Sequence, residues 1–462
     1  MQNFLRPANK LPPDIISQIA RCSLGWDDVD PTPIVPLTRV CRYWRKCITS
    51  APENWTLISS LRPGLAALSL KRSEAALLRL RLCAPSSGYG PKFLNLIVPH
   101  IQRIRTLEVW EITTVEDFTK ALPNFPQSMP NLQSLEMARL DNVPEWDPSI
   151  HPFGSFSDTL TSLNLYDIPL YPSFLKLKTL TELTLHYYKI RPPLDTILNI
   201  VEDNCSLKSV TLTIDYENFS ASVSKRRAAI TNRLQRLHVT CWDGSTARTL
   251  ISNIPLRRGA DLGITFCDKG VGLVLDHILS DIPITHLPNL RSPTYMEYSG
   301  SSPREIRLFG PNGSFWYYHG YSPEIPFAEF SVLPLADIRE VRFVHCKMPT
   351  MFHPLSFPAL ETLTLEYTTD ASRLFSALLP DPSSSPSLKT LGFLDCVFNE
   401  EFMGELARFA SNRKNTTSAW LHRVVIVQQD EKFPSVASIR ALEGLVSVVD
   451  IWFGTNLPTD LT

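Results

Sequence analysis

Apolar side chains recur through most of this chain in the order aliphatic-x-x-aliphatic-x-aliphatic. Because the last two apolar positions alternate with polar ones, each copy predicts a short strand with one buried face. Successive copies begin about 20 to 33 residues apart within two runs, from Leu77 to Leu234 and from Ile338 to Leu421. One such strand cannot bury its apolar face alone, so neighbouring copies are expected to stack. The copies are Leu77-Leu80-Leu82, Ile104-Leu107-Val109, Leu132-Leu135-Met137, Leu160-Leu163-Leu165, Leu180-Leu183-Leu185, Leu207-Val210-Leu212, Leu234-Leu237-Val239, Ile338-Val341-Phe343, Leu360-Leu363-Leu365, Leu388-Leu391-Phe393 and Leu421-Val424-Ile426.

Several segments between these strands carry helical spacing. Examples are Val115-Phe118-Leu122, Leu194-Ile197-Leu198-Val201 and Phe402-Leu406-Phe409. The motif and its period resemble the leucine-rich repeat. That resemblance implies an α/β solenoid over residues 61–462, an irregular horseshoe with parallel strands. It also implies a small side chain at the ninth position of each copy that satisfies backbone groups at the turn, here Asp215, Cys346, Thr368 and Cys396.

Residues 267–337 interrupt the repeats with a segment rich in aromatic residues, Gly and Ser. Two weak copies lie near it, at Asp261-Ile264-Phe266 and Pro303-Ile306-Leu308. Pro311-Asn312-Gly313 is a strong turn signal, and Phe315 to Tyr318 is expected to form a hairpin strand. Two interpretations stay open: a protruding loop whose Trp and Tyr residues grip a partner, or a divergent repeat whose aromatic side chains pack inward.

The N-terminal segment, residues 11–58, predicts two or three short amphipathic helices. Ile15, Ile16 and Ile19 form one apolar stripe after an early proline and aspartate. A second stripe runs through Leu37, Val40, Cys41, Trp44 and Ile48, and Ala51-Pro52 is expected to end that helix. So short a segment buries too little surface to fold alone, and we expect it to pack on the repeats without a flexible linker.

This segment resembles the F-box. The residues that carry the resemblance are Leu11-Pro12-Pro13-Asp14-Ile15-Ile16, Val40-Cys41-Arg42-Tyr43-Trp44-Arg45 and Ala51-Pro52-Glu53-Asn54-Trp55, a combination similar to the large F-box families of filamentous fungi. Residues 22–33 depart from the family pattern as an insertion. The resemblance implies a helical module at residues 1–60 that binds the Skp adaptor, and through it a cullin, using Leu11, Pro12, Ile15, Ile16, Ile19, Leu37, Val40, Cys41 and Trp44. The alternative is a helical cap on the repeats.

The chain is then expected to be a substrate-recognition subunit of an SCF-type cullin–RING ubiquitin ligase. A protein target is expected on the strand positions that face away from the core, together with two aromatic residues of the irregular segment. The candidates are Trp110, Tyr166, His186, His238, Arg307, Arg342, Trp316 and Tyr317. Glu108 and Glu366 occupy the same kind of position. The competing hypothesis is a leucine-rich-repeat interaction scaffold with no ligase role.

Composition narrows the classes of function. The formal net charge is −1, which argues against bulk attraction to nucleic acid or an anionic membrane surface. Nine cysteines without a CxxC motif, the lack of a signal peptide and the lack of a long apolar run favour reduced thiols in the cytosol or nucleus.

The sequence offers little evidence for catalysis or metal binding. None of the local motifs of hydrolases, zinc proteases or nucleotide-binding enzymes occurs, so a non-catalytic protein with no cofactor is expected, one copy per hetero-complex. His345, Cys346 and His353 lie close in sequence, but Cys346 has a repeat position and no further ligand follows at suitable spacing, so no metal site is predicted.

Overall fold

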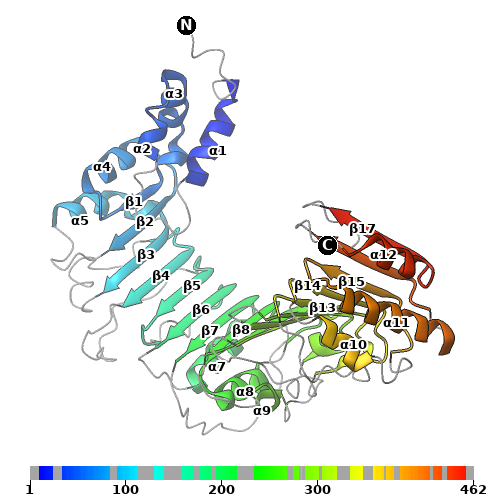
Figure 1. Cartoon of the computed structure of the whole chain (residues 1–462). Coiled ribbons are helices and arrows are strands. Elements are labelled where there is room, and N and C mark those ends of the chain that lie inside the picture. Colours follow the sequence, from blue (N-terminus) through cyan, green and yellow to red (C-terminus); the bar gives the residue numbers. More distant parts are fainter. Residues whose placement is uncertain are drawn as a thin grey trace. The chain divides into compact units, whose positions relative to one another are not determined.

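The computed structural model of the chain forms two compact units, Met1–Lys208 and Ser209–Thr462 (Figure 1). The predicted domain boundary at residue 60 stays a prediction. The residues that the structure describes are 10–23, 34–83, 91–112, 129–139, 158–170, 174, 177–188, 194–215, 234–254, 256–267, 274–279, 282, 287–300, 304–319, 333–346, 357–368, 371–378, 385–416, 420–428 and 434–453. Within those ranges no helix combines the length and apolar character that crossing a bilayer requires.

The first unit begins with short helices and continues as a parallel sheet. Its helices are α1 (Pro13–Ser23), α2 (Ile34–Leu37), α3 (Arg42–Ser50), α4 (Pro63–Arg72), α5 (Pro91–Ile97) and α7 (Leu194–Asp203), with 3-10 helices η3 (Pro52–Trp55) and η4 (Val98–Arg103). Its strands are β1 (Leu57–Ser59), β2 (Leu78–Cys83), β3 (Ile104–Ile112), β4 (Ser134–Arg139), β5 (Ser162–Tyr166) and β6 (Glu182–Tyr187). Each strand pairs in parallel with the next.

The second unit carries strands β7 (Ser209–Ile214), β8 (Arg236–Cys241), β9 (Ala260–Phe266), β10 (Tyr295–Ser299), β11 (Arg304–Gly310), β12 (Gly313–His319), β13 (Glu340–Val344), β14 (Thr362–Glu366), β15 (Thr390–Leu394), β16 (Arg423–Gln428) and β17 (Val448–Phe453). Its helices are α8 (Gly244–Asn253), α9 (Val274–Leu279), α10 (Ser372–Leu378), α11 (Glu400–Thr416) and α12 (Val436–Glu443), with 3-10 helices η7 (Pro288–Leu290) and η9 (Leu335–Asp337).

All eleven strong copies of the repeat coincide with strands, and their last two apolar side chains are buried. These side chains define the core face of each sheet. The ring of Phe393 on β15 packs against Phe375 of α10 and Phe402 of α11, which places these helices on the core face. The opposite face is called the open face below. The predicted helices at 194–201 and 402–409 are confirmed as α7 and α11, whereas the one at 115–122 lies outside the described residues.

The irregular segment is an antiparallel meander built into the second sheet. The spatial order is β9, β12, β11, β10, β13; β12 pairs in parallel with β9 and β10 pairs in parallel with β13, so only β11 runs antiparallel. Phe315 and Tyr317 are fully buried. Residues 313–319 are thus a divergent repeat that packs inward, and the protruding-loop hypothesis is wrong for them. Residues 320–332 lie outside the described part.

The hairpin between β11 and β12 needs glycine at residue 313. Gly313 has a φ of +118°, and a Cβ there would stand 2.0 Å from the carbonyl oxygen of Ala260. Asn312 fixes the same turn, because its side-chain amide donates to the carbonyl of Arg291 at 2.8 Å and its oxygen accepts from Arg258 at 2.6 Å. The predicted turn at 311–313 is confirmed.

Strand ends repeat one backbone turn in both units. Asp167, His345, Tyr367 and Asp395 each follow a strand directly, and their φ values lie between 47° and 53°. Each of their N–H groups donates to a carbonyl of the next strand at 2.7–2.9 Å. The next residue then closes the turn: Cys396 Sγ donates to Leu365 O at 3.4 Å, and Thr368 Oγ1 donates to Glu366 O at 3.2 Å. The predicted role of the ninth position is confirmed at these two residues.

Candidate interaction surfaces

The N-terminal helices enclose a small core of their own. Its buried members are Ile16, Ala20, Ile34, Trp44, Cys47, Ile48 and Trp55. Two side chains of η3 close the end of α3, because Trp55 Nε1 and Asn54 Nδ2 both donate to the carbonyl of Ile48, at 2.9 and 3.3 Å. Ser17 on α1 donates to Asn54 Oδ1 at 2.8 Å, which ties the first helix to the same corner.

The second apolar stripe is not one helix, and this corrects the sequence prediction. Cys41 is extended, with φ −161° and ψ 175°, and its sulfur accepts the N–H of Trp44 at 3.4 Å. Cys41 therefore caps the start of α3, whereas Leu37 ends α2. The break turns Val40 outward, and its side chain is 51% exposed.

The nine predicted adaptor-binding residues divide into three groups by burial. Ile16 and Trp44 are 0% and 7% exposed, so they hold the module together and offer no surface to a partner. Pro12, Ile15 and Val40 are exposed. The remaining four, which pack half-buried against the module's core, are Leu11, Ile19, Leu37 and Cys41.

One hydrogen bond links the two segments of the module that carry the exposed residues. The Tyr43 hydroxyl donates to the carbonyl of Leu11 at 2.9 Å, which joins the start of α1 to the start of α3. Tyr43 is itself exposed, as is Ile15 at 42%. Leu11 lies just before α1, and Ile15 lies in the first turn of that helix. We call Pro12, Ile15, Val40 and Tyr43 the apolar edge of the module.

The open face of the first unit carries a buried charge cluster. Glu108 on β3 accepts hydrogen bonds from Arg79 and Arg81, both on β2. The Arg81 and Glu108 side chains are almost fully buried, whereas Arg79 is partly exposed. Burial, and next the charge of Glu108, raise the pKa of Glu136 on the neighbouring strand.

An aromatic row follows this cluster along the strands and unites three predicted target-binding residues. Tyr166 and His186 stack with ring centroids 4.4 Å apart and planes 5° from parallel. Trp110 stacks more loosely on Tyr166 at 6.3 Å, and Tyr188 lies 6.3 Å beyond His186. We call Trp110, Tyr166, His186 and Tyr188 the aromatic row. Burial is the main cause that raises the pKa of Tyr166.

The open face of the second unit brings four further predicted residues into one register row. These residues lie on four different strands, β8, β12, β11 and β13. The strand order β8, β9, β12, β11, β10, β13 brings them into line. The row runs through His238, Gly263, Trp316, Arg307, Glu297 and Arg342. Tyr317 differs from the prediction: it points to the core face, because side chains alternate along β12 and its neighbour Trp316 occupies the open face.

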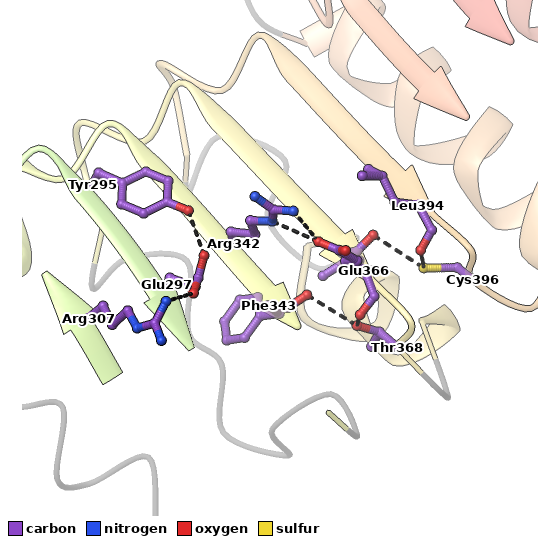
Figure 2. Close-up of polar contacts among 10 residues, drawn as sticks. Tyr295, Glu297, Arg307, Arg342, Phe343, Glu366, Thr368, Leu394 and Cys396 are labelled. Carbon is purple, nitrogen blue, oxygen red and sulfur yellow. Dashed lines mark hydrogen bonds and ion pairs between the residues drawn. The ribbon is translucent and has the colours of Figure 1, made fainter. Parts of the chain in front are cut away.

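Arginine–glutamate pairs dominate this row (Figure 2). Arg342 binds Glu366 with Nε at 2.8 Å from the carboxylate. Arg307 reaches Glu297 at 3.2 Å and Glu305 at 2.7 Å. Burial is the largest single effect and lowers the pKa of Arg342, but the hydrogen bond to Glu366 and the interactions with the Glu366 and Tyr295 side chains together outweigh it, so the net shift is upward.

A phenol extends the same network. The Tyr295 hydroxyl donates to Glu297 Oε2 at 3.0 Å (Figure 2), and burial followed by the Glu297 charge raises the pKa of Tyr295. The sequence analysis singles out none of Tyr295, Glu297 and Glu305, because it leaves the irregular segment open between a protruding loop and a divergent repeat. The signal that was available is the alternation of Tyr295 and Glu297 with apolar Met296 and Tyr298.

His238 lies beside Gly263 of the neighbouring strand β9. Its ring atom Cγ would meet a Cβ on Gly263 at 3.3 Å, and its Nε2 is 2.9 Å from Thr265 Oγ1. Burial, and next the charge of Arg236, lower the pKa of His238.

Metal-ligating residues do not gather in the described part of the chain, where no three of His, Cys, Asp or Glu are arranged around a common point. Of the sequence cluster, Cys346 is buried in its turn and His345 is exposed, and His353 lies outside the described residues.

No protein-family model matches this sequence. No curated protein matches it either. Function is therefore argued from the surfaces described above.

Proposed function

We propose that this chain is the substrate-recognition subunit of an SCF-type cullin–RING ubiquitin ligase, with the N-terminal module as an F-box that binds the Skp adaptor. The observation that carries the proposal is the apolar edge: Ile15 and Val40 remain exposed although the module already has a closed core. Apolar residues that stay exposed on a folded module favour docking to a partner over a purely internal role. Here these residues lie within the F-box-like motif.

The open faces are proposed to hold the target. Aromatic residues and arginine are the side chains most often found at the energetic centre of protein interfaces. The aromatic row supplies them in the first unit, and Trp316 with Arg307 supplies them in the second. The chain contributes proximity and orientation, and ubiquitin transfer belongs to other subunits. The compartment proposed is the cytosol or nucleus.

The test is the affinity of the full-length chain for a purified fungal Skp adaptor. Ile15→Asp and Val40→Asp each place a charge in the apolar edge and are expected to weaken binding by about tenfold or more, since 1.4 kcal/mol is a factor of ten. The Leu11→Ala, Pro12→Ala double variant is expected to weaken binding with the fold intact.

Leu68→Asp is the matched control, because Leu68 is similarly exposed but lies on α4. It is expected to bind like the wild type. Circular dichroism and urea unfolding check that each variant folds. A folded wild-type chain that does not bind the adaptor contradicts the proposal.

A second candidate is an interaction scaffold in which the helical module caps the repeats. The Arg72 guanidinium on α4 lies 4.3 Å from the ring centre of Trp55, and β1 pairs with β2 directly after η3. These contacts join the module to the first repeat, as a cap requires. Under this alternative, the apolar-edge variants leave every partner interaction of the open faces unchanged.

A further inference from the structure

Strand β17 is the last described strand of the second unit, and its core-face side chains are less buried than those of its neighbour. It pairs with β16, and with no other strand among the described residues. The core-face side chains of β16, Val424 and Ile426, are fully buried, but their register partners on β17, Val449 and Ile451, are only half-buried. Terminal units of a repeat array ordinarily present a polar outer face. In the described part of the chain, the core is therefore less completely covered at β17 than at β16.

One edge of β17, called its free edge below, pairs with no other strand that the structure describes, and its backbone groups follow a definite pattern. The N–H of Val448 donates to His422 O at 3.0 Å, so the even-numbered residues direct their backbone groups to β16. Backbone groups alternate between the two sides of a strand, so Val449, Ile451 and Phe453 direct their N–H and C=O groups to the free edge.

This edge also lacks the usual protection against strand pairing. Its sequence, Val-Val-Asp-Ile-Trp-Phe, contains no lysine and no proline. Its one charged side chain, Asp450, is already bound by Arg423 Nε at 2.6 Å. On the open face, Val448 and Trp452 are 38% and 41% exposed.

We propose that β17 pairs antiparallel with β17 of a second copy of this chain, about a twofold axis at Ile451. A symmetric pairing keeps each side chain on its own face only when it is centred on a residue. Centring on Asp450 would set two carboxylates directly opposite each other, where like charges destabilise a strand pair. Centring on Ile451 pairs Ile451 with itself in a hydrogen-bonded position and forms about six backbone hydrogen bonds between the copies.

We choose a second copy of the chain as the partner because the edge of β17 is complementary to itself in this register. In this register each Asp450 stands opposite Trp452 of the other copy, and the half-buried core residues of both copies become continuous across the axis. The sequence led us to expect one copy per complex, and the edge of β17 is the reason to depart from that. The inference does not rest on the ligase role.

The first measurement is the mass of the full-length chain in solution by sedimentation equilibrium, from low to high micromolar concentration. The expected result is a species of twice 52.2 kDa. A wild-type chain that stays monomeric over this range overturns the proposal, whether or not it binds an Skp adaptor.

Charge variants at residue 452 test the register. Trp452→Asp sets two pairs of carboxylates against each other and is expected to weaken the dimer by about tenfold or more, because like charges directly opposite destabilise a strand pair. Trp452→Lys sets an ammonium opposite each Asp450 and is expected to dimerise more tightly than Trp452→Asp. Val397→Asp, at an exposed site beyond β15, is expected to leave the mass unchanged. Equal dissociation by both residue-452 variants overturns the register.

A crosslink provides an independent check that does not depend on charge. Hydrogen-bonded antiparallel pairs have Cα atoms about 5.5 Å apart, within the range that a disulfide spans. The Ile451→Cys variant is expected to form a covalent dimer on mild oxidation, with the bond mapped by mass spectrometry between the two introduced thiols. The wild type under the same oxidant is the control. A dimer in which this bond never forms contradicts the axis at Ile451.

Discussion

The ring of Tyr166 lies flat against the ring of His186, with centroids 4.4 Å apart and planes 5° from parallel. The two residues face each other on the adjacent strands β5 and β6. Their register depends on the 20-residue interval between the two copies of the repeat that carry them.

The Tyr166–His186 stack is expected to contribute a measurable coupling energy. A double-mutant cycle with Tyr166→Ala and His186→Ala, followed by urea unfolding, should give about 0.5–1 kcal/mol. The looser stack of Trp110 on Tyr166, at 6.3 Å and 27°, serves as the control and should give less. A coupling energy of zero for the closer pair would show that its geometry is incidental.

Glu108 is expected to stabilise the first unit strongly. Glu108→Ala leaves the buried guanidinium of Arg81 without its carboxylate, and breaking a buried ion pair from one side costs about 3–5 kcal/mol. The free energy of unfolding in urea measures the loss. Glu182→Ala, on the exposed side of β6, is expected to change it by less than about 0.5 kcal/mol. Similar effects for the two substitutions would contradict the role of the cluster.

Gly313 is expected to tolerate no side chain. Gly313→Ala introduces a Cβ that overlaps the Ala260 carbonyl and holds alanine at a positive φ, so destabilisation of about 2–3 kcal/mol is expected in urea unfolding. Gly64→Ala is the matched control. A Cβ at Gly64 meets nothing within 4 Å, and alanine favours the helix by about 0.5–1 kcal/mol, so a gain in stability is expected there.

His238 is expected to make stability fall in acid. Its pKa in the folded chain lies below the ordinary 6.5, so below pH 6.5 the unfolded histidine takes up a proton before the folded one does. The contribution of His238 to the free energy of unfolding is therefore fully present above pH 6.5, and it is lost as the pH falls through the pKa of His238 in the folded chain. His238→Gln should flatten this part of the curve of melting temperature against pH. An unchanged slope in His238→Gln would contradict the assignment.

Thiol reactivity is expected to follow burial. Burial raises the pKa of Cys346 to about 11 and that of Cys396 to about 12, so neither forms the reactive thiolate near neutral pH. Cys22 and Cys205 are exposed. Brief alkylation of the native chain, mapped by mass spectrometry, should modify the exposed pair first and Cys346 and Cys396 only after unfolding. Early modification of Cys396 in the native chain would contradict its place in the turn.

The repeat could be predicted from the sequence because the alternation of apolar and polar side chains depends on each strand alone. Alternation along Leu163 and Leu165 is enough to place a strand and its buried face, and the Pro-Asn-Gly turn at 311–313 is enough to place a hairpin. By contrast, helical spacing alone joined Val40 to Trp44 in one helix. The competing effect was the capping bond from the Trp44 N–H to Cys41, which starts α3 after Val40 and turns that side chain outward.

The sequence by itself determined the strand-forming segments, their buried positions and which residues would share an open face, because side-chain alternation is a property of each strand alone. Only the tertiary structure decided which of those residues meet. Arg307 and Arg342 lie 35 positions apart in sequence, and they flank Glu297 because the meander runs back through the sheet in the order β11, β10, β13. Likewise, the open edge of β17 follows from where strand pairing stops, and a strand's own residues do not record whether a neighbour is present.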